Sequence, residues 1–457
     1  MLIRPIPYRD PLAYFEAFAN DAHAVLLDSA ALQKGKGRFS YIASDPFHVI
    51  EARRTDVFID GKPVDFDPFT ALKQELGIYA AAPACAPAPF AGGAIGYFGY
   101  ELGNWLERLP DPKRDVFNPP SLVVGFYDVV AAFDHLERKA WILGSGRPDE
   151  VIGSRADAFA HKLASAPAHP AALDWAPKGS WRPELERREI ERRIARIVEY
   201  IHAGDIFQAN FTQRSLSPRP KGLSDFMLYR RLRALNPAPF AAFLRCSDTL
   251  SVVGASPELF LRLHHDGVVE AHPIKGTRAR DIDPARDEML ARELCGSTKD
   301  RAENLMIVDL MRNDLSRVCR PGSVRVPQLY ELESFASVHH LTSVITGQLK
   351  EGAGAVDLLR ATFPGGSVTG APKIRAMEII HELEPAPRGI YCGCLGWIGF
   401  DGAMDMSMTI RTLSIANDVI LAQAGGGIVA DSDPSAEYEE SMIKIMPLLR
   451  AVTGDEQ

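Results

Sequence analysis

Hydrophobic and polar residues alternate along much of the first 145 residues, with the period of two that is typical of β-strands. We predict strands at 24–28, 37–46, 57–64, 92–99 and 121–133, and the third contains the hairpin signal Asp60-Gly61. Residues 80–90 are too rich in alanine and proline for a packed element, so we predict a loop there. The pattern therefore predicts mostly β-structure with short helices in this region.

The pattern changes further along the chain. Residues 146–183 are rich in alanine, proline and glycine at both ends, and we predict a connection there. Apolar residues then recur at helical spacing from Ile190 to Ile201, with Gly204 at the expected stop. A strand at 205–216, a helix at 299–318 and a last helix after Pro434 follow.

This mixture predicts an α+β fold with large, mainly antiparallel β-sheets and helices on their outer faces. We divide the chain into an N-terminal region (1–150), a connection (151–183) and a C-terminal region (184–457).

Residues 256–280 contain the clearest hairpin signal, Asp266-Gly267 between two alternating strands. A two-residue turn at this point places Glu258 opposite Lys275 on one face of the sheet. A surface salt bridge is the ordinary interpretation of such a pair. A bulge would shift the register by one residue and move the two side chains to opposite faces.

Composition excludes some kinds of partner. The chain has 457 residues and a formal net charge of −8, so it has no general attraction for nucleic acid or anionic membranes. No apolar run reaches the roughly 18 residues of a membrane span, and the N-terminus lacks a signal-peptide core. The six cysteines are scattered, which predicts free thiols and a cytoplasmic protein.

Two loops and two helices carry candidate chemistry. The segment PGGSVTGAPK (364–373) fails as a nucleotide-binding Walker loop because Ala371-Pro372 separates Gly370 from Lys373. It remains a candidate anion site, as does AGGGIVADS (424–432). Asp300 and Glu303 on one predicted helix, and Glu437, Glu440 and Lys444 on the last, are polar faces at helical spacing. Such faces are usually solvated, but two carboxylate-bearing helices could also converge on Mg²⁺.

Seven motifs occur in one order: PIKGT (273–277), STKDRAENLMIVDLMRND (297–314), VHHLTS (338–343), FPGGSVTGAPK (363–373), IRTL (410–413), AGGGIVADS and EYEESMIK (437–444). Together they closely resemble the chorismate-utilising enzymes, and among these the component I chains of aminodeoxychorismate synthase. The resemblance is strong over 189–450 and weaker at 26–29, 37–46 and 92–102. It implies that the sheets pack as a sandwich.

The resemblance also implies a reaction, the amination of chorismate at C4. Anthranilate synthase carries alanine at the position of Lys275, and the water-adding members of the superfamily carry lysine at the position of Gln208. Lys275 would attack C2 of chorismate while Glu258 protonates the departing hydroxyl, and ammonia would then displace the lysine.

By the same resemblance, Glu303 and Glu440 would bind Mg²⁺ as the cofactor. The residues expected beside chorismate are His340, Thr369, Arg411, Gly425, Gly426, Gly427 and Lys444. Trp397 stands where relatives often carry tyrosine, which predicts the loss of a hydroxyl contact to the substrate. A possible tryptophan pocket comprises Ser29, Lys36, Gly37, Arg38, Phe39, Pro239, Phe240 and Ala241.

No cysteine of the 457 residues has the setting of a glutaminase nucleophile. We therefore expect a separate glutamine amidotransferase subunit, component II, to supply the ammonia. Two alternatives stay open: anthranilate synthase component I, and a non-catalytic sensor of chorismate or tryptophan. The presence of the acid, the amine and the carboxylates argues against a sensor.

Overall fold

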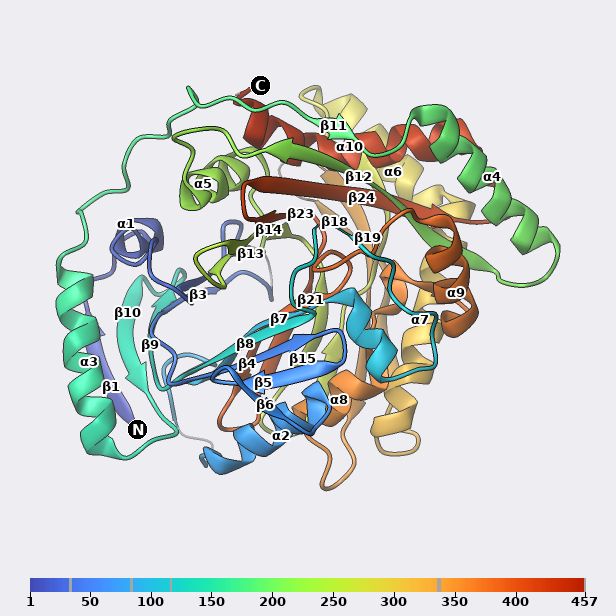
Figure 1. Ribbon diagram of the computed structural model, residues 1–457. Helices are drawn as coiled ribbons and strands as arrows, with labels where there is room; N and C mark the ends of the chain where they lie inside the picture. Colours follow the sequence, from blue (N-terminus) through green and yellow to red (C-terminus); the bar gives the residue numbers. More distant parts are fainter. Residues whose placement is uncertain (33–34, 83–84, 116, 335–337, 456–457) are drawn as a thin grey trace.

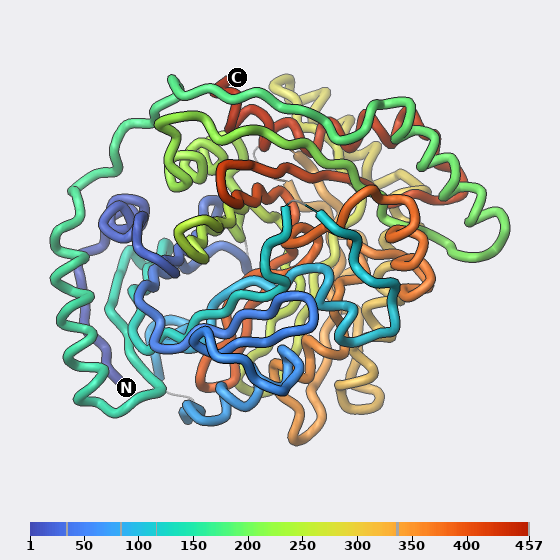
Figure 2. Tube along the Cα trace, in the orientation of Figure 1, coloured from blue at the N-terminus to red at the C-terminus, as the bar shows by residue number. Residues whose placement is uncertain are grey.

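Two large antiparallel β-sheets lie face to face, with helices on their outer surfaces (Figure 1). The structure is a computed structural model that describes residues 1–32, 35–82, 85–115, 117–334 and 338–455. The α+β sandwich expected from the sequence is therefore confirmed. The N-terminus lies at the lower left of the view in Figure 2 and the C-terminus at the top.

The first sheet is built from both ends of the chain. In spatial order it contains β1 (Leu2–Ile6), β10 (Lys139–Gly144), β9 (Val129–Asp134), β3 (Phe39–Ala43), β2 (Val25–Asp28), β13 (Phe240–Arg245), β14 (Leu250–Ser256), β23 (Thr412–Ala416), β24 (Val419–Ile428), β12 (Gln208–Pro218) and β11 (Arg182–Pro183), and β20 (Gly370–Ala371) also pairs with β12.

The second sheet mixes the chain ends in the same way. Its order is β17 (Ile274–Ala279), β19 (Val338–Gln348), β16 (Val268–Ala271), β15 (Leu259–Leu263), β22 (Met404–Met408), β21 (Cys394–Gly399), β7 (Gly93–Phe98), β8 (Leu122–Tyr127), β4 (His48–Arg53), β5 (Asp56–Ile59) and β6 (Lys62–Val64), and β18 (Arg325–Ser334) pairs with β19. Strands from 1–150 and from 184–457 thus share both sheets.

Helices cover the outer face of each sheet. The helices are α1 (Pro11–Phe15), α2 (Pro68–Ile78), α3 (Asp149–Ala164), α4 (Arg187–His202), α5 (Asp225–Leu235), α6 (Pro284–Gly296), α7 (Thr298–Val318), α8 (Ala355–Thr362), α9 (Lys373–Leu383) and α10 (Pro434–Thr453), with 3₁₀ turns η1 (Tyr100–Trp105) and η2 (Gly366–Val368). Apolar residues of α1, α3, α5 and α10 pack on the first sheet, those of α4 and α9 on β12, and those of α2, α7 and α8 on the second sheet.

Strands in the middle of the sheets are buried on both faces. In β8, Leu122, Val124 and Phe126 pack against the helix-covered side, whereas Val123 and Tyr127 pack between the two sheets. Such strands read as continuous apolar runs in the sequence because neither face contacts water. At roughly 25 cal/mol per Å² of buried apolar surface, this double burial dominates the stabilisation of the sandwich.

The predicted register of the hairpin near residue 266 is wrong. Arg262 faces Glu270 and Leu263 faces Val269, so the pairing is shifted by one residue. The reason is a longer turn, in which the His264 N–H donates to the Val268 carbonyl and Gly267 adopts a φ of +79°. β17 also leaves this hairpin and pairs with β19, where Lys275 faces Leu341.

Two helices differ from the sequence analysis. α3 begins at Asp149 and ends at Ala164, inside the segment expected to be a connection, and its residues Ile152, Ala156, Phe159 and Leu163 are buried. The last helix buries Glu437, although polar faces at this spacing are usually solvated. Glu437 therefore faces the protein, whereas half of the Glu440 side chain remains exposed.

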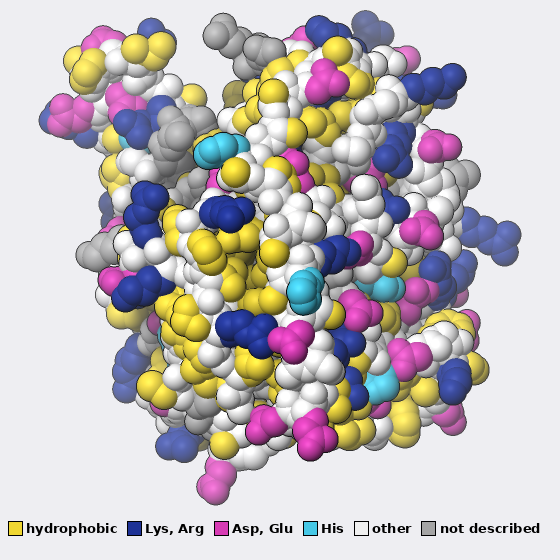
Figure 3. Space-filling view, turned by 90° about the vertical axis from the view of Figure 1, so that its left-hand side faces the viewer, with side chains coloured by type: hydrophobic (Ala, Val, Ile, Leu, Met, Phe, Trp, Pro, Cys, Tyr) yellow, Lys and Arg dark blue, Asp and Glu magenta, His cyan; other side chains and the backbone are white. Residues whose placement is uncertain are grey.

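The six cysteines are free thiols, as expected. Within the described ranges, none of the helices combines the length and the apolar character needed to cross a bilayer. On the face shown in Figure 3, hydrophobic side chains gather in a hollow near the centre, with Lys and Arg side chains around it.

A fully buried arginine joins β12 to the loop that precedes α9. Arg388 forms an ion pair with Glu384 at 2.6 Å and donates to the backbone carbonyls of Val368 at 2.7 Å and Asn210 at 2.5 Å. Only 1% of its side chain is exposed. Its guanidinium therefore satisfies several buried acceptors at once, which is the arrangement in which arginine is hardest to replace.

We predict that Arg388→Ala lowers the free energy of unfolding by about 3–5 kcal/mol, because it leaves the Glu384 carboxylate buried and unpaired. Urea denaturation measures the change. Arg192→Ala is the control, since Arg192 pairs with Glu189 on the surface and its side chain is 75% exposed. A midpoint shift no larger for Arg388→Ala than for Arg192→Ala would contradict this role.

Candidate functional site

A cavity of about 120 Å³ opens where the ends of both sheets meet α7 and α10. It is lined by residues of β12, β17, β19 and β24, by the segment before β15, by η2 and by the facing sides of the two helices. Most of its lining is polar or charged, so its walls can hold a small anionic molecule.

Most of the predicted site residues come together in this cavity. Its lining includes Glu258, Lys275, Glu303, His340, Arg411, Gly425, Gly426, Gly427, Glu440 and Lys444. Thr369 is the exception among them: its side chain is fully buried, and its hydroxyl donates to the Gly365 carbonyl at 3.0 Å.

Glu258 precedes β15 and is 4% exposed. Its Oε1 accepts a hydrogen bond of 2.6 Å from the Ser367 hydroxyl in η2. Burial raises the pKa of this carboxyl to about 7, against the opposing effects of Ser367 and Lys275. Glu258 can therefore hold a proton near neutral pH and release it inside the cavity.

Lys275 reaches the same cavity from β17. Its pKa is lowered by burial, while Glu303 acts in the opposite direction and nearby Lys444 lowers it further. In the described structure Glu258 and Lys275 do not form an ion pair, so the ordinary interpretation of a surface salt bridge is wrong. Gly276 follows with a φ of +83°, and a Cβ there would lie 3.0 Å from the Cβ of Asp300. Glycine thus lets the first turn of α7 pack closely against the strand.

α7 and α10 bring four carboxylates to the lining of the cavity, those of Asp300, Glu303, Glu437 and Glu440. The Ser297 hydroxyl caps α7 by accepting from the Asp300 N–H, and Glu303 lies one turn further on. Burial raises the pKa of Glu303 to about 7. Glu437 accepts from Lys299 at 2.9 Å, and Glu440 pairs with Lys444 at 2.6 Å. Lys444 is the main cause of the lowered pKa of Glu440.

The glycines of β24 form the floor beneath these carboxylates. β23 pairs with β24 only as far as Ala422, so the edge of Gly425–Gly427 that faces away from β12 is open to the cavity. A Cβ on Gly426 would lie 3.5 Å from a Glu437 oxygen and 3.7 Å from a Glu440 oxygen. A Cβ on Gly427 would lie 3.3 Å from a Glu303 oxygen and 2.0 Å from Gln208 Nε2. Only glycine leaves this space free.

The donor set beside these glycines fits Mg²⁺, which binds oxygen ligands and keeps several waters. Within the residues that the structure describes, no three ligand-type side chains are close enough to enclose a metal ion by themselves. Carboxylates of α7 and α10 would thus supply only part of the shell, which matches the way proteins bind Mg²⁺ together with a substrate oxyanion.

Two further predicted residues are held by unusual contacts. Arg411 has a φ of +52°, and its Nη1 donates to the Lys444 carbonyl at 2.6 Å. Burial lowers its pKa to about 10, which still leaves the guanidinium charged at neutral pH. His340 contacts the Thr277 hydroxyl at 2.9 Å, and burial lowers its pKa to about 3, so the imidazole is neutral.

Three residues that lie beside the predicted site residues were not predicted from the sequence. Lys299 pairs with Glu437, and Ser367 donates to Glu258. Tyr391 lines the cavity beside Arg411. Lys299 and Ser367 stand inside the quoted motifs STKDRAENLMIVDLMRND and FPGGSVTGAPK, so their motif membership was the available signal. Tyr391 lies outside every motif.

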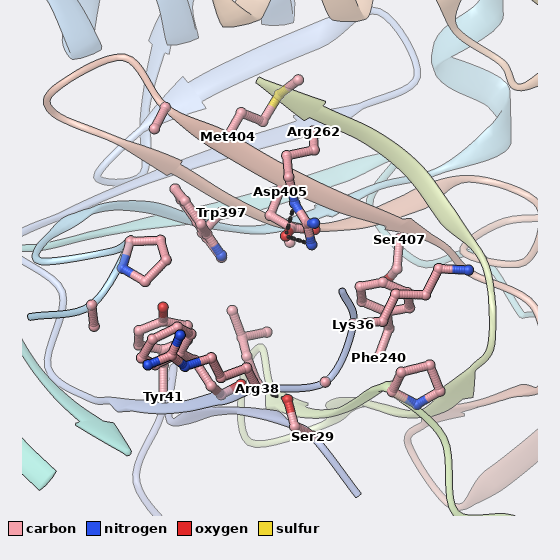
Figure 4. Close-up of a pocket in the computed structure, with 18 of the residues that line it drawn as sticks. Ser29, Lys36, Arg38, Tyr41, Phe240, Arg262, Trp397, Met404, Asp405 and Ser407 are labelled. Carbon is pink, nitrogen blue, oxygen red and sulfur yellow. Dashed lines mark hydrogen bonds and ion pairs between the residues drawn. The ribbon is translucent and has the colours of Figure 1, made fainter. Parts of the chain in front are cut away.

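A second, larger cavity of about 760 Å³ lies between the sheets and is shown in Figure 4. All the residues of the possible tryptophan pocket line it: Ser29, Lys36, Gly37, Arg38, Phe39, Pro239, Phe240 and Ala241. Trp397 also lies here, beside Tyr41, and not beside the first cavity. The prediction that Trp397 removes a hydroxyl contact to the substrate is therefore wrong. Lys36 is 3% exposed and pairs with Glu333 at 2.7 Å.

Comparison with known proteins places the chain in a family. The model of chorismate binding enzymes matches residues 27–450. Aminodeoxychorismate synthase component 1 of Klebsiella aerogenes is 40% identical over 451 residues, covering 97% of each chain. Anthranilate synthase component 1 of Streptomyces coelicolor is 39% identical over 458 residues, covering 96% of this chain and 86% of its own.

A solved structure shares the fold. Anthranilate synthase component I from Streptococcus pneumoniae superimposes with a TM-score of 0.81 at 32% identity, over 92% of this chain and 94% of its own. Relatives named for two different activities are thus similar to this chain to almost the same degree.

We predict that the stability of a Glu258→Gln variant, relative to the unaltered protein, increases with pH. Below the ordinary pKa of 4.5, Glu258 is protonated in both folded and unfolded chains. Between that value and about 7 only the unfolded chain ionises, so the unaltered protein loses stability, on the order of 3 kcal/mol in total. Urea denaturation in EDTA at pH 5 and pH 8 measures the difference.

Glu440→Gln provides a control of opposite sign. The pKa of Glu440 is lowered, so its carboxylate stabilises the fold above the ordinary pKa and loses that effect as the pH falls. Its replacement should therefore destabilise the protein to nearly the same extent at pH 8 and pH 5, because both values lie above the ordinary pKa of 4.5. Equal differences for Glu258→Gln at the two pH values would show that this carboxyl is not held protonated by burial.

Proposed function

The chain belongs to the family of chorismate binding enzymes, and we propose that it aminates chorismate at C4 to form 4-amino-4-deoxychorismate. The observation that supports this most is the presence of Lys275, with a lowered pKa, in one cavity with the protonatable Glu258. Relatives named aminodeoxychorismate synthase component 1, which are 40% identical over 97% of this chain, support the same choice.

Lys275 acts as the nucleophile. Its neutral amine attacks C2 of the ring, the double bond shifts, and the C4 hydroxyl leaves as water after it takes the proton of Glu258. Ammonia then attacks C4, the double bond shifts back, and the bond from C2 to Lys275 breaks. Glu258 recovers a proton from the incoming nitrogen, so the sum is chorismate plus ammonia giving aminodeoxychorismate plus water.

The shared cavity makes the two required protonation states compatible. Burial disfavours both the ammonium form of Lys275 and the carboxylate form of Glu258. Burial thus shifts both groups toward the uncharged forms that the reaction needs, a neutral amine and a neutral carboxylic acid. Splitting the displacement into two steps also explains why the amine arrives at the carbon that lost oxygen.

The remaining residues bind the anionic groups of chorismate. Arg411, Lys444 and the open edge of Gly425–Gly427 hold one carboxylate. Glu303 and Glu440 would hold Mg²⁺, which supplies positive charge for the ring carboxylate when it is bound. His340 stays neutral and shapes the wall of the cavity. Thr369 acts from behind this wall, since its hydroxyl bonds to Gly365.

Gln208 supports amination over the addition of water. It is 1% exposed, and its Nε2 lies beside Gly427 at the cavity floor. A carboxamide cannot remove a proton from water at neutral pH. Its Oε1 is buried and has no hydrogen-bond partner among the described residues.

A second chain would supply the ammonia. The relatives are named component 1, which implies a component II, and we propose that a glutamine amidotransferase subunit fills this role. The product would then serve 4-aminobenzoate and folate synthesis. Anthranilate synthase component I remains the alternative, since relatives with that name are as similar as 39%.

We predict that the purified chain converts chorismate to aminodeoxychorismate when ammonium and Mg²⁺ are present, with no fluorescent anthranilate. Without ammonia, it should accumulate an adduct of chorismate minus water on Lys275, because the second displacement cannot occur. Product chromatography and intact-mass spectrometry with peptide mapping measure the two outcomes.

Lys275→Ala should lose the adduct and most of the amination, and Glu258→Gln should suppress both. EDTA should abolish turnover by the unaltered chain. Glutamine alone should not replace ammonium unless component II is added. Anthranilate as the direct product would establish the alternative activity, and an unaltered rate in Lys275→Ala without any adduct would exclude covalent catalysis.

We further propose that the second cavity binds tryptophan. It combines the aromatic walls Phe39, Tyr41 and Phe240 with the polar Ser29 and Lys36 (Figure 4). This combination suits a ligand with an apolar ring and a charged head.

We predict that titration calorimetry detects saturable L-tryptophan binding, and that Phe240→Trp weakens it at least tenfold by filling the cavity. Ala88→Gly, a smaller change in the same wall, is the control. An absence of heat with the unaltered chain would show that L-tryptophan does not bind. Equal binding by Phe240→Trp would show that L-tryptophan binds outside the second cavity.

A further inference from the structure

Glu258 carries one short hydrogen bond that the proposed reaction does not yet use. The Ser367 hydroxyl donates to its Oε1 at 2.6 Å, and both side chains are buried, at 7% exposure for Ser367 and 4% for Glu258. Donors at this distance from a carboxyl oxygen are among the strong hydrogen bonds in proteins. The contact lies on the wall of the first cavity, which includes both residues.

Ser367 is fixed from several sides. Its own carbonyl accepts from Asn210 Nδ2 at 3.1 Å, and the next carbonyl, that of Val368, accepts from the buried Arg388 at 2.7 Å. The Thr369 hydroxyl closes the turn on the Gly365 carbonyl. η2 is thereby tied to β12 and to the Glu384–Arg388 ion pair, so the serine hydroxyl has a defined position.

The main groups that act on the Glu258 carboxyl, apart from burial, favour a charge on it. Lys275 approaches from β17, Lys36 from the segment before β3, and the Ile274 N–H donates from the backbone. Ser367 is the only one of these that contributes a side-chain hydroxyl. A hydroxyl can donate to a carboxylate oxygen without adding a competing charge beside Lys275.

We propose that Ser367 is a positioning residue for proton transfer by Glu258. Its hydroxyl occupies Oε1, so the acidic proton resides on Oε2 and is available to the departing hydroxyl of the substrate. After transfer, the same hydroxyl stabilises the carboxylate that forms. This inference rests on the proposed function, because it assigns the acid role to Glu258.

The direction of a pH effect follows from this contact. A hydrogen bond to the charged form lowers the pKa of a carboxyl, and Ser367 lowers that of Glu258 against the larger effect of burial. Removal of the hydroxyl should therefore raise the pKa of Glu258 further above 7. The acid would stay protonated to higher pH but would release its proton less readily.

The test measures the rate of Lys275 adduct formation without ammonia, as a function of pH, in four variants. Ser367→Ala and Ser367→Cys should slow adduct formation at least tenfold at pH 7 and move the descending limb of the profile to higher pH. Binding of chorismate should change less than threefold. Ser367→Thr retains a hydroxyl and should recover most of the rate and the original limb.

Ser343→Ala is the matched control, because the Ser343 hydroxyl makes an equally short 2.6 Å bond to Asn304 in a buried place outside the cavity. It should leave the pH profile unchanged. The cysteine variant keeps the size of serine, so it remains informative if the alanine variant folds poorly.

An unchanged rate and limb in Ser367→Cys or Ser367→Ala would overturn the assignment. The same would follow if Ser367→Thr were as slow as Ser367→Ala, since the hydroxyl would then not be the active feature. A fully active Glu258→Gln would instead overturn the proposed function itself, whatever the serine variants do.

Discussion

The removal of charged groups from water at the junction of the two sheets is the constraint on which the site depends. Burial acts on Glu258, Lys275, Glu303 and Arg411 alike, and it is the largest influence on the pKa of each. In water these groups would ionise and pair. Inside the sandwich, burial shifts the acid and the amine of one cavity toward their uncharged forms, whereas the Arg411 guanidinium keeps its charge at neutral pH.

This environment exists because the strands around the cavity end irregularly. β24 runs past its neighbour β23, which leaves the edge of Gly425–Gly427 open, and α7 and α10 cover that opening with carboxylates and lysines. The buried Arg388 holds the loop of Ser367 against β12 on the other side. The chemistry is thus placed on irregular segments, and the regular core around them supplies rigidity.

The periodic elements were predictable from sequence, and long-range pairing was not. The isoleucines of α4 identified a helix because their spacing reflects one buried face, and the apolar run of β8 identified a strand that is buried on both faces. The turn near Gly267 was missed because Asp-Gly suits a two-residue loop, whereas here His265 joins the turn. Lys275 still reaches the cavity of Glu258, since β19 delivers it by a pairing that no local pattern encodes. Motif membership located most site residues, but it could not show that Ser367 contacts Glu258 or that Trp397 lies in the other cavity.

The mixed origin of both sheets determines the order in which the polypeptide can acquire its structure. β7 faces β21, with Phe98 opposite Cys394, and β2 faces β13, with Leu26 opposite Phe243. Phe98 and Cys394 are separated by nearly 300 residues. During synthesis, the edge of β7 that pairs with β21 therefore stays unpaired until these residues have left the ribosome. Topologies with such distant partners fold slowly and expose aggregation-prone edges meanwhile. Neither half of this chain therefore contains a complete sheet, and each half alone would leave strand edges without their partners.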